Sequence, residues 1–394
     1  MYCVALTLLP PQTAHSIRCI HVRPKSTGPT ITDVAHKAYV SKATVSHVLN
    51  NTRFVEDGTR QRVLTAIAEL GYRPNALARS LTTRRTGTIG MIVSDASNYF
   101  FAELLRGAED VLRPANYALI VCNTDEILQH EEHYLDLLLG QRVEGIIAAA
   151  TSQQWTVLDE AALRHVPVVF VDRRFDGLQG PFVGADNVTG ARQGTLHLIE
   201  AGHREIGIVA GFQRLSSIRE RLDGFMQALA MHDIPLPPEW VVPCPLSIED
   251  GRQAAHEILT LPKRPSALFV SNNLLMLGAL LAVKDLGLQC PEDIAMMGFD
   301  DHPWAAVSAP PLSVVRQPAH EIGRIAADLL CALIDGRQVE KSCIELGCEL
   351  VLRQSCCRSH AESRESVPPM AMSKEVLSPE FSGDLLALKS RVPS

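Results

Sequence analysis

The stretch SKATVSHVLNN, residues 41–51, carries side chains suited to reading a groove of DNA. Val45, Val48 and Leu49 recur with the spacing of one helical face, so polar and basic side chains are left on the opposite face. Short hydrogen-bonding and basic groups can contact base edges and phosphates, although an ordinary solvated helix surface is the alternative. The outward residues are Lys42, Ala43, Ser46, His47 and Asn50.

A second set of polar residues stands at or just after the ends of apolar runs in the rest of the chain. Carboxylate, amide and guanidinium groups with interleaved aromatic rings suit a hydroxyl-rich ligand, whereas strand-end capping or a salt bridge is the alternative for any single one. The set is Ser94, Asp95, Asn98, Tyr99, Phe100, Phe101, Asp125, Asp172, Arg173, Arg174, Asp186, Asn187, Asn272, Asn273, Asp300, Asp301 and Trp304. Arg219 and Arg221, which open a helix after a loop, join this set.

The elements that position this second set alternate between apolar runs and helical stretches. Continuous apolar strands flanked by helices predict parallel sheets covered on both faces, and two such series predict two doubly wound lobes with a cleft between them. Ligands settle beyond the carboxyl ends of such strands. Expected strands are TIGMIV, YALIV, GIIAAA, PVVFVD and FVGAD in the first series, and IGIVAG, SALFVS and IAMMGFDD in the second.

The first set belongs to a small all-α unit. Ile31, Val34, Ala35 and Ala38 have the spacing of an amphipathic helix, for which Thr32 is the expected N-cap. Ser41 is expected to cap the second helix, and a third helix over 59–70 ends at Gly71. Three short helices on one core predict a helix-turn-helix unit, whose second helix lies in the major groove.

The charge distribution agrees with a DNA-binding head on an acidic body. The chain of 394 residues has a net charge of −7, yet residues 30–86 hold nine Lys or Arg against four Asp or Glu. Their excess of five positive charges leaves about −12 on the remainder. A basic unit attached to an acidic one suits phosphate binding together with solubility.

Several classes of protein are disfavoured by what the sequence lacks. No apolar run reaches the length of a membrane span, and the opening residues lack the basic start of a secretory signal, so we expect a cytoplasmic protein without a membrane partner. The ten cysteines form no CxxC pair and are expected to be reduced. There is no Walker-type loop or GxSxG, and HEEH at 130–133 is not HExxH, so we expect no enzyme, cofactor or metal site.

The head also resembles a known family. The patterns TxxDVAxxAxVSxATVSxVLNN and TRxxVxxAIxELGYxPNxxARSL look like the lactose-repressor (LacI/GalR) family of bacterial transcription regulators. The resemblance implies that Lys42, Ala43 and His47 read bases and that Thr44 and Ser46 contact phosphate. Position 47 is usually arginine in the family, and histidine offers only one ring edge to a base. Thr32 and Asn50 complete the expected DNA-binding set of the head.

Residues 74–86 are expected to form a hinge. Asn75 can cap a helix of about seven residues, and a helix that short is marginal on its own in water. The resemblance implies that this hinge helix folds on operator DNA, pairs with its dimer mate and inserts Leu81 into the minor groove, with Arg79, Arg84 and Arg85 near phosphate. A basic flexible linker is the alternative.

The body resembles the regulatory core of the same family, which is similar to type I periplasmic sugar-binding proteins. The resemblance covers 87 to about 355 and implies effector contacts from Arg221 in RERLDGF, Asn272 in SNNLLMLGAL and Asp300 in GFDD. Asp172, the NYFF turn and Trp304 are further expected contacts. The full expected set is Asn98, Phe100, Phe101, Asp125, Asp172, Arg173, Arg219, Arg221, Asn272, Asp300 and Trp304.

These observations predict an α/β protein: a helix-turn-helix head on a two-lobed core of the type I periplasmic-binding-protein kind, acting as a homodimeric repressor of a carbohydrate-utilisation operon. Its partners would be a near-palindromic double-stranded operator and a sugar or sugar-acid effector. A purine- or nucleoside-responsive regulator and a sugar-binding protein that regulates no DNA are the alternatives. Expected boundaries are 1–29 for an extension or overcalled start, 30–73 for the head, 74–86 for the hinge, 87–187 with 318–340 for the first lobe, 188–313 with 341–355 for the second, and 356–394 for a disordered tail.

Overall fold

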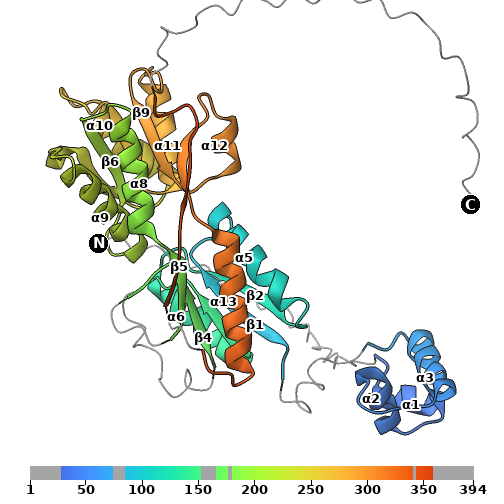
Figure 1. The fold of residues 1–394 in the computed structure, drawn as a ribbon. Helices are drawn as coiled ribbons and strands as arrows, with labels where there is room; N and C mark the ends of the chain where they lie inside the picture. Colours follow the sequence, from blue (N-terminus) through green and yellow to red (C-terminus); the bar gives the residue numbers. More distant parts are fainter. Residues whose placement is uncertain (1–27, 74–84, 152–165, 176–179, 340–342, 358–394) are drawn as a thin grey trace, which may run out of the picture.

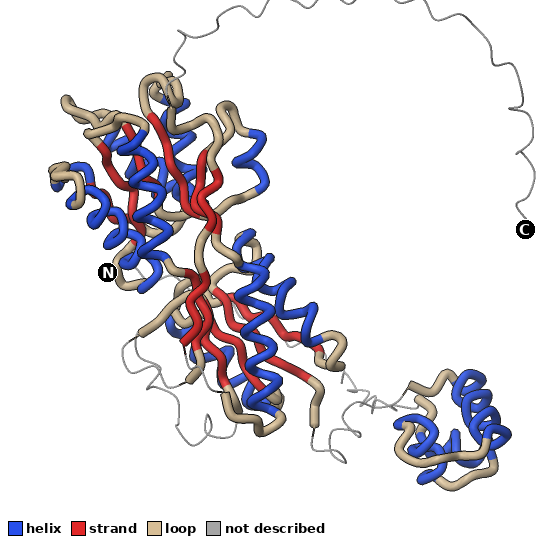
Figure 2. Tube along the Cα trace, viewed as in Figure 1, coloured by secondary structure: helices blue, strands red, loops and turns tan. Residues whose placement is uncertain are grey.

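The computed structural model describes residues 28–73, 85–151, 166–175, 180–339 and 343–357 (Figure 1). Within these ranges the chain forms a small helical head and a body of two α/β lobes, each built on one six-stranded sheet. Figure 2 shows that the head contains helices only, whereas each lobe has strands layered between helices. No helix in the described ranges is both long and apolar enough to cross a membrane.

Three helices enclose the small core of the head. Val34, Val45 and Val63, one from each helix, are fully buried and meet at its centre. This agrees with the expected helix-turn-helix unit, in which each helix contributes one apolar face. The helices are α1 (Ile31–Ala38), α2 (Lys42–Asn50) and α3 (Asp57–Leu70).

The N-cap of α1 is Thr30 and not Thr32, so that part of the prediction is wrong. The Thr30 hydroxyl accepts a hydrogen bond from the backbone N–H of Asp33, and the Asp33 carboxylate accepts one from the backbone N–H of Thr30 at 2.7 Å. This reciprocal pair satisfies two otherwise unpaired donors and starts the helix at Ile31. Thr32 therefore lies inside the first turn, where it is half-buried.

The other two expected caps of the head are confirmed. The Ser41 hydroxyl accepts a hydrogen bond from the backbone N–H of Thr44 at 3.1 Å, which fixes the start of α2. Gly71 ends α3 with a φ of 60°, a conformation that costs glycine little. The third helix begins at Asp57, two residues earlier than expected.

The first lobe is a parallel sheet covered on both faces, with strand order β11-β5-β4-β3-β1-β2. Helices α5 and α13 cover one face and α6 covers the other. The sheet contains β1 (Thr88–Val93), β2 (Ala118–Asn123), β3 (Gly145–Ala148), β4 (Val168–Val171), β5 (Phe182–Ala185) and β11 (Cys343–Leu346), and the helices are α5 (Tyr99–Leu112), α6 (Leu128–Gly140) and α13 (Ala319–Ile334).

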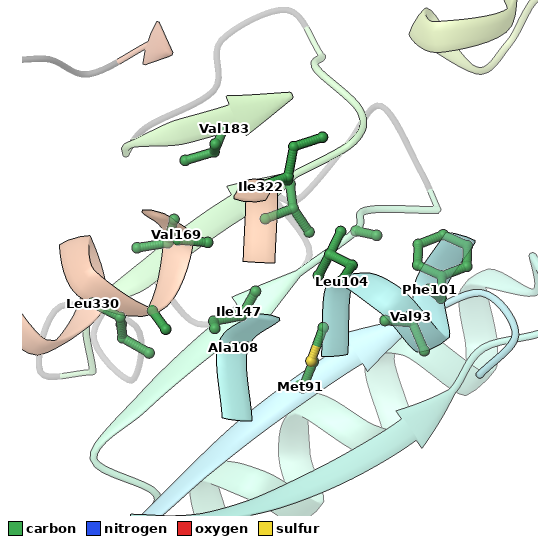
Figure 3. Close-up of a cluster of buried hydrophobic side chains, with 14 of the residues drawn as sticks. Met91, Val93, Phe101, Leu104, Ala108, Ile147, Val169, Val183, Ile322 and Leu330 are labelled. Atoms are coloured by element: carbon green, nitrogen blue, oxygen red, sulfur yellow. The ribbon is translucent and has the colours of Figure 1, made fainter. Parts of the chain in front are cut away.

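The core of this lobe follows from the two-residue alternation of its strands. Met91, Ile147 and Val169 point from the sheet toward Leu104 of α5 and Ile322 of α13, as Figure 3 shows. Residues at intervening positions of the strands face α6 instead. Because both faces are buried, the strands read as continuous apolar runs in the sequence.

Two glycines allow α5 and α13 to pack closely. A Cβ added at Gly107 would lie 1.9 Å from the backbone oxygen of His320, and one added at Gly323 would lie 1.8 Å from that of Leu104. The obstructing atoms belong to backbone, so no side-chain rotation could relieve the clash. The pair therefore sets the distance between the two helices that cover this sheet face.

The second lobe repeats the plan with strand order β12-β10-β9-β8-β6-β7, in which only β12 is antiparallel. Helices α8 and α9 pack on one face, and α10 and α11 on the other. The elements are β6 (Ile206–Gly211), β7 (Val241–Cys244), β8 (Ala267–Val270), β9 (Ala295–Phe299), β10 (Ser313–Arg316), β12 (Glu349–Val351), α8 (Asn187–Glu200), α9 (Ser216–Ala230), η2 (Pro238–Trp240), α10 (Ile248–Leu259), α11 (Asn273–Asp285) and α12 (Pro303–Val307).

The chain crosses between the lobes three times, after β5, β10 and β11, and the third crossing corrects an expected boundary. Residues 341–355 were assigned to the second lobe, but β11 pairs with β5 in the first sheet and only β12 joins the second. The second-lobe segment also extends past 313, since β10 continues to Arg316. Cys356 is fully buried in the second lobe, so the packed body continues one residue beyond the expected limit of 355.

Candidate effector cavity and DNA-reading helix

A cavity of about 200 Å³ lies between the lobes, where the carboxyl ends of both sets of strands meet. Both lobes and the crossing segments contribute to its wall. Nine of the eleven residues expected to contact an effector line this one space. They are Asn98, Phe100, Phe101, Asp125, Asp172, Arg173, Arg221, Asn272 and Asp300.

The structure does not bring Arg219 to this cavity. Helix α9 begins at Ser216, and two positions along a helix differ by about 200° in direction. Arg221 therefore points inward and is 3% exposed, whereas Arg219 is exposed on the outer side.

Trp304 also lies outside the cavity wall. It packs against the second-lobe core from α12, and its ring stacks on His302 at 5.5 Å between centroids. His302 in turn contacts Tyr99 of the first lobe at 5.0 Å. The indole thus belongs to an aromatic chain beside the cleft.

Several cavity residues were not among the expected effector contacts. Ser94 and Asp95 were noted as strand-end residues, and both line the wall. Glu126 follows Asp125 directly, and its position after an apolar run was a signal for it. Gln317 lies in the crossing segment after β10, and only the path of that segment brings it to the wall. The further lining residues are Ser217, Ile218, Leu246 and Leu274.

Four acidic residues of the wall have left-handed backbone conformations. The φ angles are 52° at Asp125, 59° at Glu126, 65° at Asp172 and 75° at Asp300. Side chains with a Cβ seldom adopt this region, and such outliers gather at functional sites where the surrounding structure enforces them. Their concentration around one cavity makes it the candidate binding site of the body.

Arg221 is held on three sides and presents its remaining edge to the cavity. Its Nε donates to Asn187 Oδ1 at 2.9 Å and its Nη1 to the backbone oxygen of Ser271 at 2.8 Å. The guanidinium carbon lies 3.8 Å from the centre of the Phe299 ring, and Nη1 is 4.0 Å from Asp300 Oδ2. Nη2 makes no hydrogen bond within the described part of the chain, so it is available to a bound acceptor.

Asp172, Arg173 and Glu126 form a buried charged group on the opposite wall. Arg173 donates to both Glu126 oxygens, at 2.8 and 2.6 Å, and its Nε lies 3.0 Å from Asp172 Oδ2. Burial raises the pKa of Asp172. The positive charges of Arg173 and Arg221 partly offset this rise, and the negative charge of Asp300 adds to it. Burial alone would lower the pKa of Arg173, but the two carboxylates outweigh it and raise that pKa, so the guanidinium stays charged.

Gln317 offers the clearest unmet hydrogen bond of the site. Its Nε2 donates to Asp300 Oδ1 at 2.6 Å, which fixes the orientation of the amide. Its Oε1 is buried and has no partner among the described residues. A buried acceptor without a donor is unfavourable, so a ligand hydroxyl or N–H would satisfy it.

The charge of the cavity wall selects among ligands. Five carboxyl groups line it, from Asp95, Asp125, Glu126, Asp172 and Asp300, against the two guanidinium groups of Arg173 and Arg221. A cation or a neutral molecule rich in donors suits this field better than an anion. No cluster of His, Cys, Asp and Glu within the described ranges has the arrangement of a metal site.

Direct contacts between the lobes flank the cavity. The amides of Asn98 and Asn273 exchange hydrogen bonds at 2.8 and 3.3 Å. Arg174 of the first lobe donates its backbone N–H to the Ser216 hydroxyl at 2.7 Å and its Nη2 to Glu220 at 2.8 Å. These contacts depend on how closely the lobes approach, so they link the state of the cavity to the lobe arrangement.

The outer face of α2 agrees with the expected DNA-reading surface in its exposure. Lys42, Ala43 and Asn50 are exposed, whereas Thr44, Ser46 and His47 are half-buried. Three contacts orient these side chains. His47 Nδ1 lies 2.8 Å from Thr52 Oγ1, Asn50 Nδ2 donates to the Ser46 backbone oxygen at 3.0 Å, and the Ser41 and Thr44 hydroxyls are 2.9 Å apart.

The expected hinge residues fall largely outside the described residues. Asn75, Arg79, Leu81 and Arg84 all lie in 74–84. Arg85 is described, and its guanidinium lies 3.7 Å from Glu144 and 3.9 Å from Asp335 of the first lobe.

Comparison with known proteins gives two family matches that together cover the head and much of the body. Residues 30–75 match the model of bacterial regulatory proteins of the lacI family, and residues 195–356 match the periplasmic binding protein-like domain. The chain is 36% identical over 330 residues to the HTH-type transcriptional repressor PurR of Photobacterium profundum, which covers 83% of this chain and 98% of that protein. It is 35% identical over 326 residues to the ribose operon repressor of Haemophilus influenzae, with the same coverage. Its fold is similar to that of the lac repressor dimer bound to operator and an anti-inducer, with a TM-score of 0.76, 29% identity, and coverage of 84% of this chain and 99% of that one.

Proposed function

Because the chain belongs to the lacI family of bacterial regulatory proteins and is therefore a DNA-binding transcriptional repressor, we propose that a neutral monosaccharide controls its affinity for operator DNA. The repressor would govern a carbohydrate-utilisation operon. It would act as a homodimer on a near-palindromic operator, since a twofold protein matches a twofold site. The family consists of transcription regulators rather than enzymes, so the cavity is a sensor.

The observation that carries this proposal is the density of polar groups around a small cavity. About 200 Å³ is small beside pockets for drug-sized ligands, yet it presents carboxylates, amides and guanidinium groups from both lobes. Each hydroxyl of a monosaccharide both donates and accepts, so it can satisfy neighbouring carboxylates and guanidinium groups together. Phe100 and Phe101 supply a contact for the apolar face of a sugar ring.

The excess of carboxylates argues for a neutral sugar over a sugar acid or a sugar phosphate. The guanidinium of Arg173 is already paired with Glu126 and Asp172, whereas Arg221 is held by Asn187 and Ser271 and has only Nη2 left for a ligand. An added anion would face more negative than positive charge on the cavity wall.

A purine-responsive regulator is the second candidate. The identity to a repressor named PurR favours it, as do two phenylalanine rings on which a base could stack. Against it, a base offers fewer donors than a sugar, and the wall is rich in acceptors. The two candidates therefore differ in how many of the wall carboxylates the ligand can hydrogen-bond, and a sugar can bond more of them than a base.

On the DNA side, we assign the major groove to α2. Lys42, Ala43 and His47 would contact base edges, and Thr44 and Ser46 would contact phosphates. Thr32 and Asn50 complete this surface. In the hinge, Asn75 would cap a helix in which Leu81 enters the minor groove and Arg79 lies near phosphate.

Effector binding would alter operator affinity by changing the lobe arrangement. A ligand shifts such an equilibrium only as far as its affinities for the two arrangements differ. The Asn98–Asn273 and Arg174–Glu220 contacts join the lobes on either side of the cavity, so a bound sugar would favour one set of these contacts.

The test is a calorimetric titration of the full-length protein with D-ribose, D-xylose, D-glucose, D-gluconate, ribose 5-phosphate and hypoxanthine. We expect one neutral sugar to bind, Arg221→Ala to abolish that binding, and Arg219→Ala to leave it unchanged. Because Arg219 points away from the cavity on the same helix, it is the matched control. Binding of hypoxanthine alone would favour the second candidate, and binding of gluconate or the phosphate alone would contradict the charge argument.

The same protein should select a duplex from a random-sequence DNA library. The sugar that binds should then change the affinity for the selected duplex. An affinity for the selected duplex that no sugar changes would contradict the proposed control of DNA binding by a monosaccharide.

A further inference from the structure

Glu220, on α9 of the second lobe, bonds to a different residue through each of its carboxylate oxygens. Its Oε1 accepts a hydrogen bond from Arg174 Nη2 at 2.8 Å, and its Oε2 accepts one from Asn187 Nδ2 at 3.0 Å. Arg174 follows β4 in the first lobe, whereas Asn187 begins α8 of the second lobe. One carboxylate therefore joins a first-lobe guanidinium to a second-lobe amide.

Asn187 extends this connection to the cavity wall. Its buried Nδ2 donates to Glu220 and to the backbone oxygen of Ala185 at 3.2 Å, and its Oδ1 accepts from Arg221 Nε at 2.9 Å. An asparagine amide has its donors on one side and its acceptor on the other, so a reversed amide would lose all three bonds. The carboxylate of Glu220 thus helps to fix the orientation in which Asn187 accepts from Arg221.

The direction of the Arg221 guanidinium depends on that acceptor. Among the residues that the structure describes, Nε bonds only to Asn187 Oδ1, and Nη1 bonds to the Ser271 carbonyl at 2.8 Å. Two bonds from different nitrogens fix the plane of a guanidinium, whereas one bond leaves it free to rotate. Loss of the Asn187 bond would therefore misdirect Nη2, the nitrogen that is left for a ligand.

At the other end of the connection, Arg174 is anchored in the first lobe. Its Nη1 lies 2.7 Å from Glu345 Oε1 on β11, and its guanidinium carbon lies 5.5 Å from the centre of the Phe182 ring on β5. Arg174 does not line the cavity. Its contact with Glu220 exists only while the lobes are close, so any effect of Arg174 on a ligand must pass through protein groups.

We propose that Glu220 is a positioning residue that couples the approach of the two lobes to the contact between Arg221 and the sugar. The inference rests on the proposed control by a monosaccharide and assigns the route of that control. With the lobes close, Arg174 holds the carboxylate that orients Asn187 and hence Arg221. With the lobes apart, Glu220 loses this partner. Because such coupling is reciprocal, a sugar bound at Arg221 favours the Arg174–Glu220 contact to the same extent.

The first test needs no ligand. Urea denaturation of the full-length protein gives the free energies of unfolding of Arg174→Ala, Arg221→Ala and the double variant. Residues that share no partner give additive losses. We expect the double variant to lose less than the sum of the two single losses, and the losses to add once Glu220→Ala is present in all the proteins. Additive losses with Glu220 intact would overturn the proposal.

Arg219 provides the matched control for this cycle. It lies next to Glu220 on the same helix and is exposed on the outer side. The losses of Arg174→Ala and Arg219→Ala should therefore add. A shortfall as large as that of the Arg174 and Arg221 pair would overturn the proposal, because the coupling would then not depend on the bonds through Asn187.

The second test uses whichever of D-ribose, D-xylose and D-glucose the wild type binds in calorimetry. Arg174→Ala should weaken that binding by roughly fivefold or more, the lower end of couplings between separate sites. In a Glu220→Ala background the same substitution should have no further effect. Arg106→Ala, which removes a first-lobe guanidinium paired with Glu109, should bind the sugar as tightly as the wild type.

The two tests separate this proposal from the proposed function. Equal sugar affinities of Arg174→Ala and the wild type would overturn the coupling while leaving control by a sugar intact. If none of the three sugars binds the wild type, the proposed function fails, and the unfolding cycle still supports or overturns the link between Arg174 and Arg221.

Discussion

The cavity and the DNA-reading helix use polar side chains in opposite ways. In the cavity, Arg221, Arg173 and Gln317 are buried and bonded to neighbouring protein groups before any ligand arrives. On α2, Lys42 and Ala43 are exposed, and Lys42 has no ion pair among the described residues. A substitution in the preorganised cavity should therefore lower both the stability of the protein and its affinity for the ligand. A substitution on the exposed face of α2 should lower only the affinity for DNA.

The largest effect that tests this contrast is expected at Arg221. Arg221→Ala would remove the donor to Asn187 Oδ1 and to the Ser271 carbonyl. It would also remove the positive charge 4.0 Å from the buried Asp300 carboxyl, which would keep only its bond from Gln317. We expect the free energy of unfolding to fall by about 3 kcal/mol. Urea denaturation followed by circular dichroism measures it.

Arg219→Ala serves as the control on the same helix and should change stability by no more than about 0.5 kcal/mol. Equal losses in the two variants would remove the distinction between a preorganised wall and an ordinary helix surface.

At Lys42 the contrast predicts a loss of DNA binding without a loss of stability. Lys42→Ala should weaken binding to a selected operator by at least tenfold, since a good base contact contributes about 1 to 3 kcal/mol. Its urea midpoint should match that of the wild type. Lys263→Ala, which removes an exposed lysine paired with Glu205 in the second lobe, should change neither quantity. A destabilised Lys42→Ala would mean that this face of α2 is also structural.

A change of specificity is expected at His47. His47→Arg would replace one ring edge with a guanidinium able to bind guanine through two hydrogen bonds, at the cost of the contact with Thr52. Selection from a random duplex library should then shift one position of each half-site toward guanine, with a preference of about 1 to 2 kcal/mol. An unchanged selected sequence would exclude His47 from base reading.

The smallest effect concerns pH. Burial raises the pKa of Asp172, so the stability linked to this group is fully present below the unfolded pKa of about 3.9 and is lost as pH rises through the folded pKa. Asp172→Asn cannot ionise, so its stability relative to the wild type should improve as the pH rises from acid to neutral. Urea midpoints across this range measure the trend. If the plots of urea midpoint against pH were parallel for the two proteins, burial would not raise the pKa of the Asp172 carboxyl.

Most of the architecture was predictable because it is local. The head follows from apolar spacing and from the serine and glycine at its helix ends, and the expected caps at Ser41 and Gly71 are confirmed. The cap of α1 was misplaced from Thr30 to Thr32, since two threonines stand near the start of the apolar pattern and only Thr30 has Asp33 three residues later to complete the reciprocal bond.

For the cavity, the sequence predicted which strand ends come together but not the direction of every side chain. Parallel strands place their carboxyl ends at one edge, so polar residues after apolar runs converge whatever the details of the loops. Trp304 was expected there because it follows such a run, but the short helix α12 directs its ring onto His302 and the second-lobe core.

The sequence by itself determined the periodicities, the charged head and the residue types at the strand ends, because these depend on neighbours within a few positions. Only the tertiary structure decided which arginine of α9 faces inward, because that depends on where the helix starts against the sheet. It also decided that β11 pairs with β5 and that Gln317 reaches the cavity wall. Both outcomes depend on contacts between segments far apart in the chain, and such contacts cannot be predicted from the local sequence pattern.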